Sequence, residues 1–183
     1  MTNFDFFKTA IKDYRVGAIT ESSKFVIRKV ISYLKPEHKY IVEYGAGNGV
    51  VTREILKSLP AGGRLAAVEL NADFAAQLEK IKDPRLIVVR GDVLVVSAEL
   101  SKLGFPQIDA VICNMPFTVI KAETREEIVR NTRAALREGG IFLIYQYSVL
   151  VLPLLKKHFS KVELAFEPRN LPPYFFMKAE KTK

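Results

Sequence analysis

Two hydrophobic patterns alternate along most of the chain. Short runs of consecutive apolar residues, typical of strands buried on both faces, are separated by segments whose apolar residues recur every three or four positions, as in helices. The runs predict strands at 39–44, 64–70, 85–90, 108–114 and 141–147. The periodic segments predict helices at 50–59, 72–81, 97–103, 123–137 and 149–159. This alternation indicates an α/β fold whose parallel sheet is covered by helices on both faces.

The last third of the chain adds two features to this pattern. Gly139 and Gly140 follow the expected helix at 123–137, a place where glycine commonly ends a helix. Two further apolar runs, 162–166 and 174–181, lie close together in the sequence. Their short connection predicts an antiparallel hairpin at one edge of the sheet.

The first residues predict helices that precede the sheet. Helical spacing over 4–15 gives one apolar stripe and one basic stripe. The apolar stripe comprises Phe4, Phe7, Ile11 and Tyr14, and the basic stripe comprises Lys8, Lys12 and Arg15. A second helix is expected at about 21–34. We therefore divide the chain into a helical arm, residues 1–35, and one α/β domain, residues 36–183.

The net charge of the 183 residues is concentrated at the two ends. Lys and Arg number 28 against 20 Asp and Glu, which gives +8. Residues 1–40 carry +4, residues 41–150 are balanced, and residues 151–183 carry +4. A basic surface predicts an anionic partner, either nucleic acid, an anionic membrane surface or an acidic substrate. The alternative is a surface that only keeps the protein in solution.

Several classes of chemistry are excluded by what the sequence lacks. The one cysteine, Cys113, allows neither a disulfide framework nor a multi-cysteine zinc site. His38 and His158 stand in no motif with a nucleophile, and no residues have metal-ligand spacing, so we expect no bound metal. No run of about 18 apolar residues and no signal peptide is present. Group transfer, with a cofactor carrying the reactive group, is the mechanism that remains.

A glycine-rich loop follows the first predicted strand. The segment Glu43–Gly49 has glycine at positions 45, 47 and 49 and is followed by a helix. Such a turn lets the backbone approach a ligand at the carboxyl end of a strand. A dinucleotide fingerprint would have glycine where Val50 stands, which disfavours a pyrophosphate ligand.

Acidic residues follow the next two predicted strands. Glu69, with Leu70 beside it, ends the second strand twenty residues beyond Gly49, where a carboxylate can accept both hydroxyls of a ribose. Asp92 follows the third strand and is suited to the exocyclic amine of adenine, with Val93 against the ring. Asp92 alone is equally suited to capping a helix. Together with the glycine loop, these residues describe a pocket for an adenosine without phosphates.

The fourth strand ends in the turn Asn114-Met115-Pro116-Phe117. Asn114 offers a hydrogen-bond acceptor and a donor beside the expected reactive centre. Pro116 stiffens the turn, and Phe117 offers a flat surface for a base or a cation. The alternative is an ordinary connection between a strand and a helix.

In this order, the four elements resemble the S-adenosylmethionine-dependent methyltransferases of the seven-strand, Rossmann-like class I. The resemblance covers residues 39–147 and implies S-adenosylmethionine as the cofactor. It implies that the glycine loop packs on the methionine part, that Glu69 holds the ribose and that Asp92 holds the adenine. The residues expected to bind the cofactor on this basis are Glu43, Gly45, Ala46, Gly47, Gly49, Glu69, Leu70, Asp92, Val93 and Asn114.

Two subfamilies compete for the acceptor. The segments 14–23 and 169–173 are similar to the bacterial phospholipid N-methyltransferases, which methylate phosphatidylethanolamine. This resemblance implies a cytoplasmic enzyme docked on an anionic membrane by its N-terminal amphipathic helix, which the stripes at 4–15 fit. The Asn-Met-Pro-Phe turn is instead similar to the motif of the rRNA adenine dimethyltransferases. Those enzymes carry an additional helical domain after the last strand, and this chain ends at Lys183.

The expected reaction is attack of a neutral amine, most simply that of phosphatidylethanolamine, on the cofactor methyl group. Asn114, Tyr14 or Tyr147 are the candidates for orienting the amine. Arg169 is the candidate for the lipid phosphate, with Lys12 or Arg15 as alternates; on the RNA hypothesis, Pro116 and Phe117 meet the target base. A third hypothesis is a catalytically silent module that binds the same cofactor. The sequence does not predict the oligomeric state.

Overall fold

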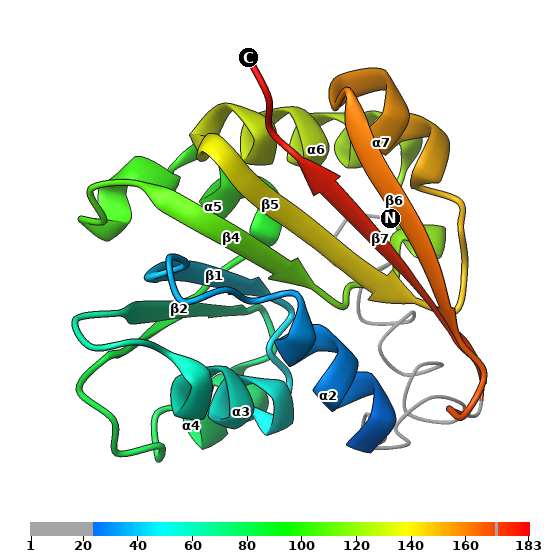
Figure 1. Cartoon of the computed structure of the whole chain (residues 1–183). Helices are drawn as coiled ribbons and strands as arrows, with labels where there is room; N and C mark the ends of the chain where they lie inside the picture. The colour runs from blue at the N-terminus through cyan, green and yellow to red at the C-terminus, as the bar shows by residue number, and fades with distance from the viewer. Residues whose placement is uncertain (1–23, 171) are drawn as a thin grey trace, which may run out of the picture.

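The computed structural model describes residues 24–170 and 172–183 as one seven-stranded sheet in the order β3-β2-β1-β4-β5-β7-β6 (Figure 1). The strands are β1 (Tyr40–Tyr44), β2 (Arg64–Glu69), β3 (Leu86–Arg90), β4 (Ile108–Cys113), β5 (Leu136–Gln146), β6 (Lys161–Glu167) and β7 (Tyr174–Glu180). Neighbours among β1 to β5 are parallel, whereas β7 is antiparallel to both β5 and β6. This arrangement confirms the predicted parallel sheet with an antiparallel C-terminal hairpin.

Helices cover both faces of the sheet, as the apolar runs predicted. The helices on one face are α2 (Lys24–Ser32), α3 (Val50–Ser58) and α4 (Ala72–Leu78), and those on the other are α5 (Val93–Ala98), α6 (Ala122–Ala135) and α7 (Leu152–His158). Short 3-10 helices also lie at Leu100–Leu103 and Phe117–Val119. Each face has its own apolar core, because alternate residues of every central strand point to opposite sides.

Two predicted boundaries are wrong. The helix expected at 97–103 begins earlier, at Val93, because Asp92 Oδ1 accepts a hydrogen bond from the Leu94 N–H at 2.8 Å and so starts α5. Gly139 and Gly140 do not end a helix. They lie within β5, where the Gly139 N–H donates to the Lys181 carbonyl at 2.7 Å. Glycine is required at 139 because its φ is 74°, a left-handed conformation that side chains disfavour.

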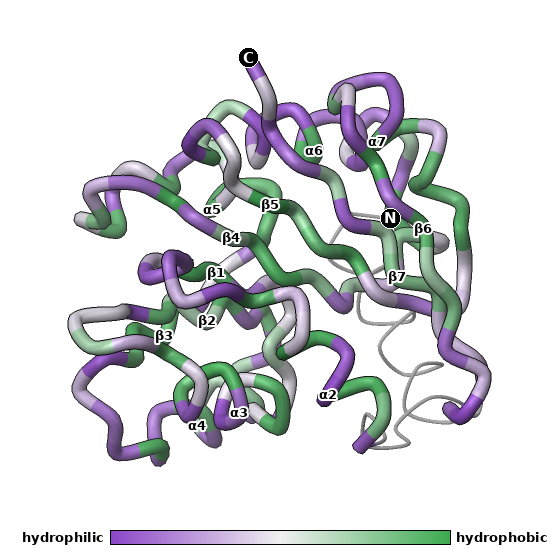
Figure 2. Tube along the Cα trace, viewed as in Figure 1, coloured by the Kyte–Doolittle hydropathy of each residue, from purple (hydrophilic) through white to green (hydrophobic). Residues whose placement is uncertain are grey.

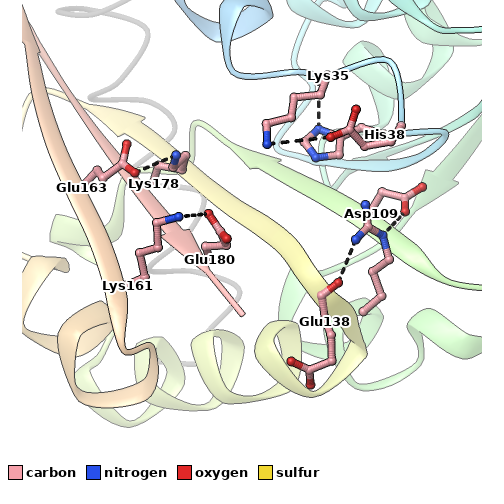
Figure 3. Close-up of polar contacts among 10 residues, drawn as sticks. Lys35, His38, Asp109, Glu138, Lys161, Glu163, Lys178 and Glu180 are labelled. Carbon is pink, nitrogen blue, oxygen red and sulfur yellow. Dashed lines mark hydrogen bonds and ion pairs between the residues drawn. The ribbon is translucent and has the colours of Figure 1, made fainter. Parts of the chain in front are cut away.

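A buried carboxylate, that of Asp109 (labelled in Figure 3), ties three strands together at the edge where the parallel strands begin. Asp109 Oδ2 accepts from the backbone N–H groups of Lys39 and Tyr40, at 2.9 and 2.7 Å. Asp109 Oδ1 accepts from Gln107 Nε2 at 2.8 Å and from Arg137 Nε at 2.5 Å. With its polar atoms satisfied, this carboxylate fixes the start of the sheet and leaves the opposite, carboxyl edge for ligands.

Candidate active site

The glycine loop joins β1 to α3 at the carboxyl edge. Gly45, Gly47 and Gly49 have φ values of 72°, 56° and 79°, all in the left-handed region. A Cβ at Gly49 would approach a Leu78 methyl group to 2.8 Å, so α4 packs directly on the end of the loop. A Cβ at Gly47 would meet nothing within 4 Å. The middle of the loop therefore faces open space while its ends are packed.

Glu69 lies directly against this loop. Its Oε2 accepts from the Gly47 N–H and its Oε1 from the Asn71 N–H, both at 2.8 Å. The side chain is buried at the end of β2. Each carboxylate oxygen has a second lone pair, so Glu69 can accept further hydrogen bonds from a ligand beside Gly47.

Glu43 lies beneath the loop rather than beside the open space. Its carboxyl group is buried and accepts a 2.6 Å hydrogen bond from the Thr52 hydroxyl of α3. Burial raises the pKa of Glu43 to about 8, the Thr52 hydrogen bond opposes this, and the charge of Glu69 adds to it. Glu43 is therefore largely protonated at neutral pH and links β1 to α3.

The end of β3 brings Asp92 beside Glu69. The Gly91 N–H donates to the Glu69 carbonyl at 3.1 Å, so the two acids follow neighbouring strand ends. Asp92 is exposed and caps α5, and Val93 is buried beneath it. One oxygen of Asp92 caps the helix, and the carboxylate has capacity for further hydrogen bonds. Its predicted contact with adenine stays a prediction.

The Asn114–Phe117 turn is held from both sides. The Asn114 N–H donates to the Tyr44 carbonyl at 3.3 Å, and the Phe117 N–H donates to Gln146 Oε1 at 3.3 Å. The Phe117 ring is fully buried in the core on the α6 side, while Pro116 is half-buried. A base stacked on Phe117 would need the turn to move, and the predicted roles of both residues toward a substrate stay predictions.

A tyrosine side chain contacts Asn114 at the same edge, and a second tyrosine lies near the first. The Tyr174 hydroxyl is hydrogen-bonded to the Asn114 side chain, and the Tyr147 hydroxyl lies 3.0 Å from the Thr118 hydroxyl. Burial raises the pKa of Tyr174, the hydrogen bond from Asn114 lowers it, and Tyr147 raises it further. Tyr174 is therefore a neutral hydroxyl group at physiological pH.

The sequence prediction missed Tyr174 and Gln146. The predicted antiparallel hairpin contains the signal for Tyr174, because a strand antiparallel to β5 must begin at the carboxyl edge.

Arg169, the predicted phosphate ligand, is already paired. Its Nε and Nη2 donate to the two Glu167 carboxylate oxygens at 2.7 and 2.8 Å, and its guanidinium lies 4.3 Å from the centre of the Phe25 ring. The Arg169 guanidinium lowers the pKa of Glu167 to about 2. The side chain of Arg169 remains largely exposed. The other candidates, Lys12, Tyr14 and Arg15, lie outside the described residues.

Nucleophilic catalysis by the cysteine finds no support in this site. Cys113 is fully buried in β4, and burial raises the pKa of its thiol to about 12. Among residues 24–170 and 172–183, no three His, Cys, Asp or Glu side chains are grouped to hold a metal ion. The site offers binding and positioning groups.

A model of the family described as a methyltransferase domain matches residues 42–142, more than half of the chain. The chain belongs to this methyltransferase family. The match covers the glycine loop and the ends of β2, β3 and β4, where the site residues lie. The order of the seven strands, with the antiparallel C-terminal hairpin, is that of the class I fold.

Three known proteins illustrate what this methyltransferase is similar to. It is 28% identical over 162 residues to an ornithine lipid N-methyltransferase of Singulisphaera acidiphila, covering 86% of this chain and 84% of that protein. It is 31% identical over 96 residues to the ribosomal RNA small subunit methyltransferase A of a Burkholderia species, covering 51% of this chain but 34% of that protein. The 1,6-didemethyltoxoflavin-N1-methyltransferase of Burkholderia thailandensis, solved with S-adenosylhomocysteine, has the same fold, with a TM-score of 0.72, 20% identity and coverage of 96% and 87%.

The cofactor of this methyltransferase is S-adenosylmethionine. The site fits it, because the open space at Gly47 adjoins the Glu69 carboxylate and a side chain at position 47 would enter that space. Which atoms each of the predicted residues contacts, from Glu43 to Asn114, stays a prediction. In the described part of the chain, no helix combines the length and apolar character needed to cross a membrane.

Proposed function

We propose that this methyltransferase transfers methyl groups to the amine of a membrane lipid headgroup, with phosphatidylethanolamine as the first candidate. The similarity to the ornithine lipid N-methyltransferase over 86% of the chain carries the proposal. The group of Asn114, Tyr147 and Tyr174 supports it, because these uncharged polar side chains suit a neutral amine better than a charged one.

Asn114 orients the amine in this proposal. Its side chain is hydrogen-bonded to the Tyr174 hydroxyl group, and an amide offers both a donating NH2 group and an accepting oxygen. In the proposal the NH2 group donates to Tyr174, and the amide oxygen accepts a hydrogen bond from the amine. Tyr174 is accordingly a positioning residue, because it acts on the substrate through Asn114.

The bound cofactor supplies an electrophilic methyl group. A neutral amine would accept this methyl group on its lone pair and would give up its surplus proton to water. Glu69 and the glycine loop would hold the cofactor, and Asn114 would orient the amine toward it. Arg169, or Lys12 or Arg15, meets the lipid phosphate, and Arg169 does so by sharing its guanidinium with Glu167.

A second candidate acceptor is an adenine amino group of RNA. The Asn-Met-Pro-Phe turn and the similarity to the Burkholderia ribosomal RNA methyltransferase over 51% of the chain favour it. The buried Phe117 ring weighs against it, because a flipped base needs a free aromatic face.

A transfer assay separates the two candidates. The full chain is supplied with cofactor labelled in the methyl group and, in separate reactions, with anionic vesicles containing phosphatidylethanolamine or with total RNA. Label in the lipid supports the proposal, whereas label in adenine overturns it in favour of the RNA candidate. Cofactor binding without transfer to either acceptor overturns both and favours the silent module.

A further inference from the structure

Exposed apolar side chains gather at one corner of the molecule. Among the described residues, the exposed large apolar side chains are Val95, Tyr147, Val149, Leu150, Leu164 and Phe166. All except Val95 belong to the connection between β5 and α7 or to β6. We call these five residues, Tyr147, Val149, Leu150, Leu164 and Phe166, the corner patch. Figure 2 shows the apolar stretches of this connection beside β6.

The strand register places both parts of the corner patch at the carboxyl edge. Gln146 of β5 is paired with Phe175 of β7, which is paired in turn with Phe166 of β6. Adjacent strands are about 4.8 Å apart, so the end of β5 and Phe166 are separated by about 10 Å. The Phe166 and Phe175 rings lie 5.1 Å apart, and the buried Val151 turns the connection toward the face that α7 covers.

The opposite face of the same hairpin is charged. Lys161 pairs with Glu180 at 2.8 Å and Lys178 pairs with Glu163 at 2.9 Å, each directly across the two strands (Figure 3). Opposed charges of this kind keep an edge hairpin in water. The exposed Leu164 alternates with these positions on β6. Apolar exposure is therefore confined to one face of the hairpin.

Charge identifies the occupant of the corner patch. At the carboxyl edge, Arg169 follows β6, and Lys29 of α2 donates from its Nζ to the carbonyl oxygen of Phe166 at 2.8 Å. Glu167, the acid beside them, is buried and paired with Arg169, so Lys29 leaves one positive charge beside the patch. An apolar surface bordered by excess positive charge suits the interface of an anionic bilayer, which attracts basic groups and admits apolar ones.

We infer that the corner patch docks this methyltransferase on an anionic lipid bilayer, a membrane contact additional to any made by the helix predicted at 4–15. The inference rests on the proposed function. Tyr147 belongs to the patch and its hydroxyl lies against Thr118 in the turn that follows Asn114. Docking through the patch thus places the bilayer surface beside the group that orients the acceptor amine.

The test compares the full chain with the double variant Leu150→Gln, Phe166→Gln and with the control Val95→Gln. Val95 is more exposed than either residue, at 57% against 47% and 49%, and lies on α5, outside the patch. Tyr147 is left intact because it adjoins the acceptor site. Binding is measured to phosphatidylcholine vesicles with and without phosphatidylglycerol.

We expect the double variant to bind the anionic vesicles at least about tenfold more weakly than the unmodified chain. The control should bind them as the unmodified chain does. Cofactor affinity, measured by calorimetry, should be the same in all three. Unchanged vesicle binding by the double variant overturns the inference. A lowered melting temperature of the double variant also overturns it, because the patch would then be covered by another part of this chain. Conversion of a dimer into a monomer by the double variant overturns it too, because the patch would then be covered by a second copy.

Methyl transfer on the anionic vesicles, with phosphatidylethanolamine added as the acceptor, distinguishes the docking surface from the proposed lipid acceptor. Loss of vesicle binding by the double variant, together with no methyl transfer to any lipid by the unmodified chain, would leave the docking surface standing and sink the lipid acceptor. Transfer to vesicle lipids at an equal rate by both proteins would sink the docking surface and leave the acceptor standing.

Discussion

Replacing Glu43 with glutamine should stabilise the protein at neutral pH. The buried carboxyl group accepts its hydrogen bond from Thr52, and the glutamine carbonyl oxygen can accept the same bond. The substitution thus removes the ionisable group and keeps the link between β1 and α3. It isolates the cost of ionising a carboxyl group beneath the glycine loop.

The magnitude follows from the raised pKa. In the folded protein the pKa of Glu43 is about 8, against an ordinary value of 4.5. The stability associated with the protonated group is complete below pH 4.5 and is lost as the pH rises through 8, at about 1.4 kcal/mol per pH unit. The difference between these two pKa values corresponds to at most about 5 kcal/mol in the free energy of unfolding. The variant should therefore match the unmodified chain at pH 4.5 and exceed its stability increasingly up to pH 8.

Urea denaturation followed by circular dichroism, at intervals from pH 5 to 9, measures this difference. Glu54→Gln, at a surface carboxylate of α3 paired with Lys57, is the control and should give a nearly constant difference. Parallel stability curves for Glu43→Gln and the unmodified chain across this range would refute a buried, largely protonated Glu43.

Three further predictions concern the cofactor, the acceptor and the loop. Glu69→Gln should weaken cofactor binding about a hundredfold by calorimetry, because the ribose hydroxyls lose two hydrogen bonds to a charged acceptor; an unchanged dissociation constant would contradict the assigned role. Tyr174→Phe should lower kcat about fivefold to tenfold without changing cofactor affinity, because Asn114 loses its orienting partner, and equal kcat values would remove that role. Gly49→Ala should cost about 1–3 kcal/mol more than Gly62→Ala, since both have positive φ but only the Cβ at 49 meets a leucine of α4; equal urea midpoints would show that packing does not matter there.

Two conservative variants serve as controls, one for the kcat of Tyr174→Phe and one for the cofactor affinity of Glu69→Gln. Tyr40→Phe removes a hydroxyl group at the opposite edge of the sheet and should leave kcat unchanged. Asp73→Asn removes a surface carboxylate in the first turn of α4 and should leave the cofactor dissociation constant unchanged.

The sequence was a good guide to the sheet because burial on both faces makes every central strand a continuous apolar run. It misplaced the start of β5, where Gly139 and Gly140 have no such pattern. Hydrogen bonds between that segment and Lys181, some forty residues away, hold it in the sheet. Local spacing cannot report a partner so distant in the sequence. The early start of α5, by contrast, had a local signal in Asp92, whose capping role was recognised as an alternative.

The cofactor side of the site was more predictable than the acceptor side. Glu69 and the loop at Gly47 follow consecutive parallel strands, so chain order alone brings them to one edge. The contact between Asn114 and Tyr174 depends on the register of β7 against β5, which no motif encodes. The pairing of Arg169 with Glu167 depends on the conformation of the turn after β6 and was likewise not foreseen.

The central claim, that the acceptor is a lipid amine, is tested most directly by blocking that amine. Transfer of labelled methyl groups is measured with the full chain on anionic vesicles that contain phosphatidylethanolamine, and on otherwise identical vesicles in which the headgroup amine is acetylated. The account predicts labelled lipid with the free amine and none with the acetylated one. Equal labelling of the two lipids, or no label in either while RNA becomes labelled, would contradict it.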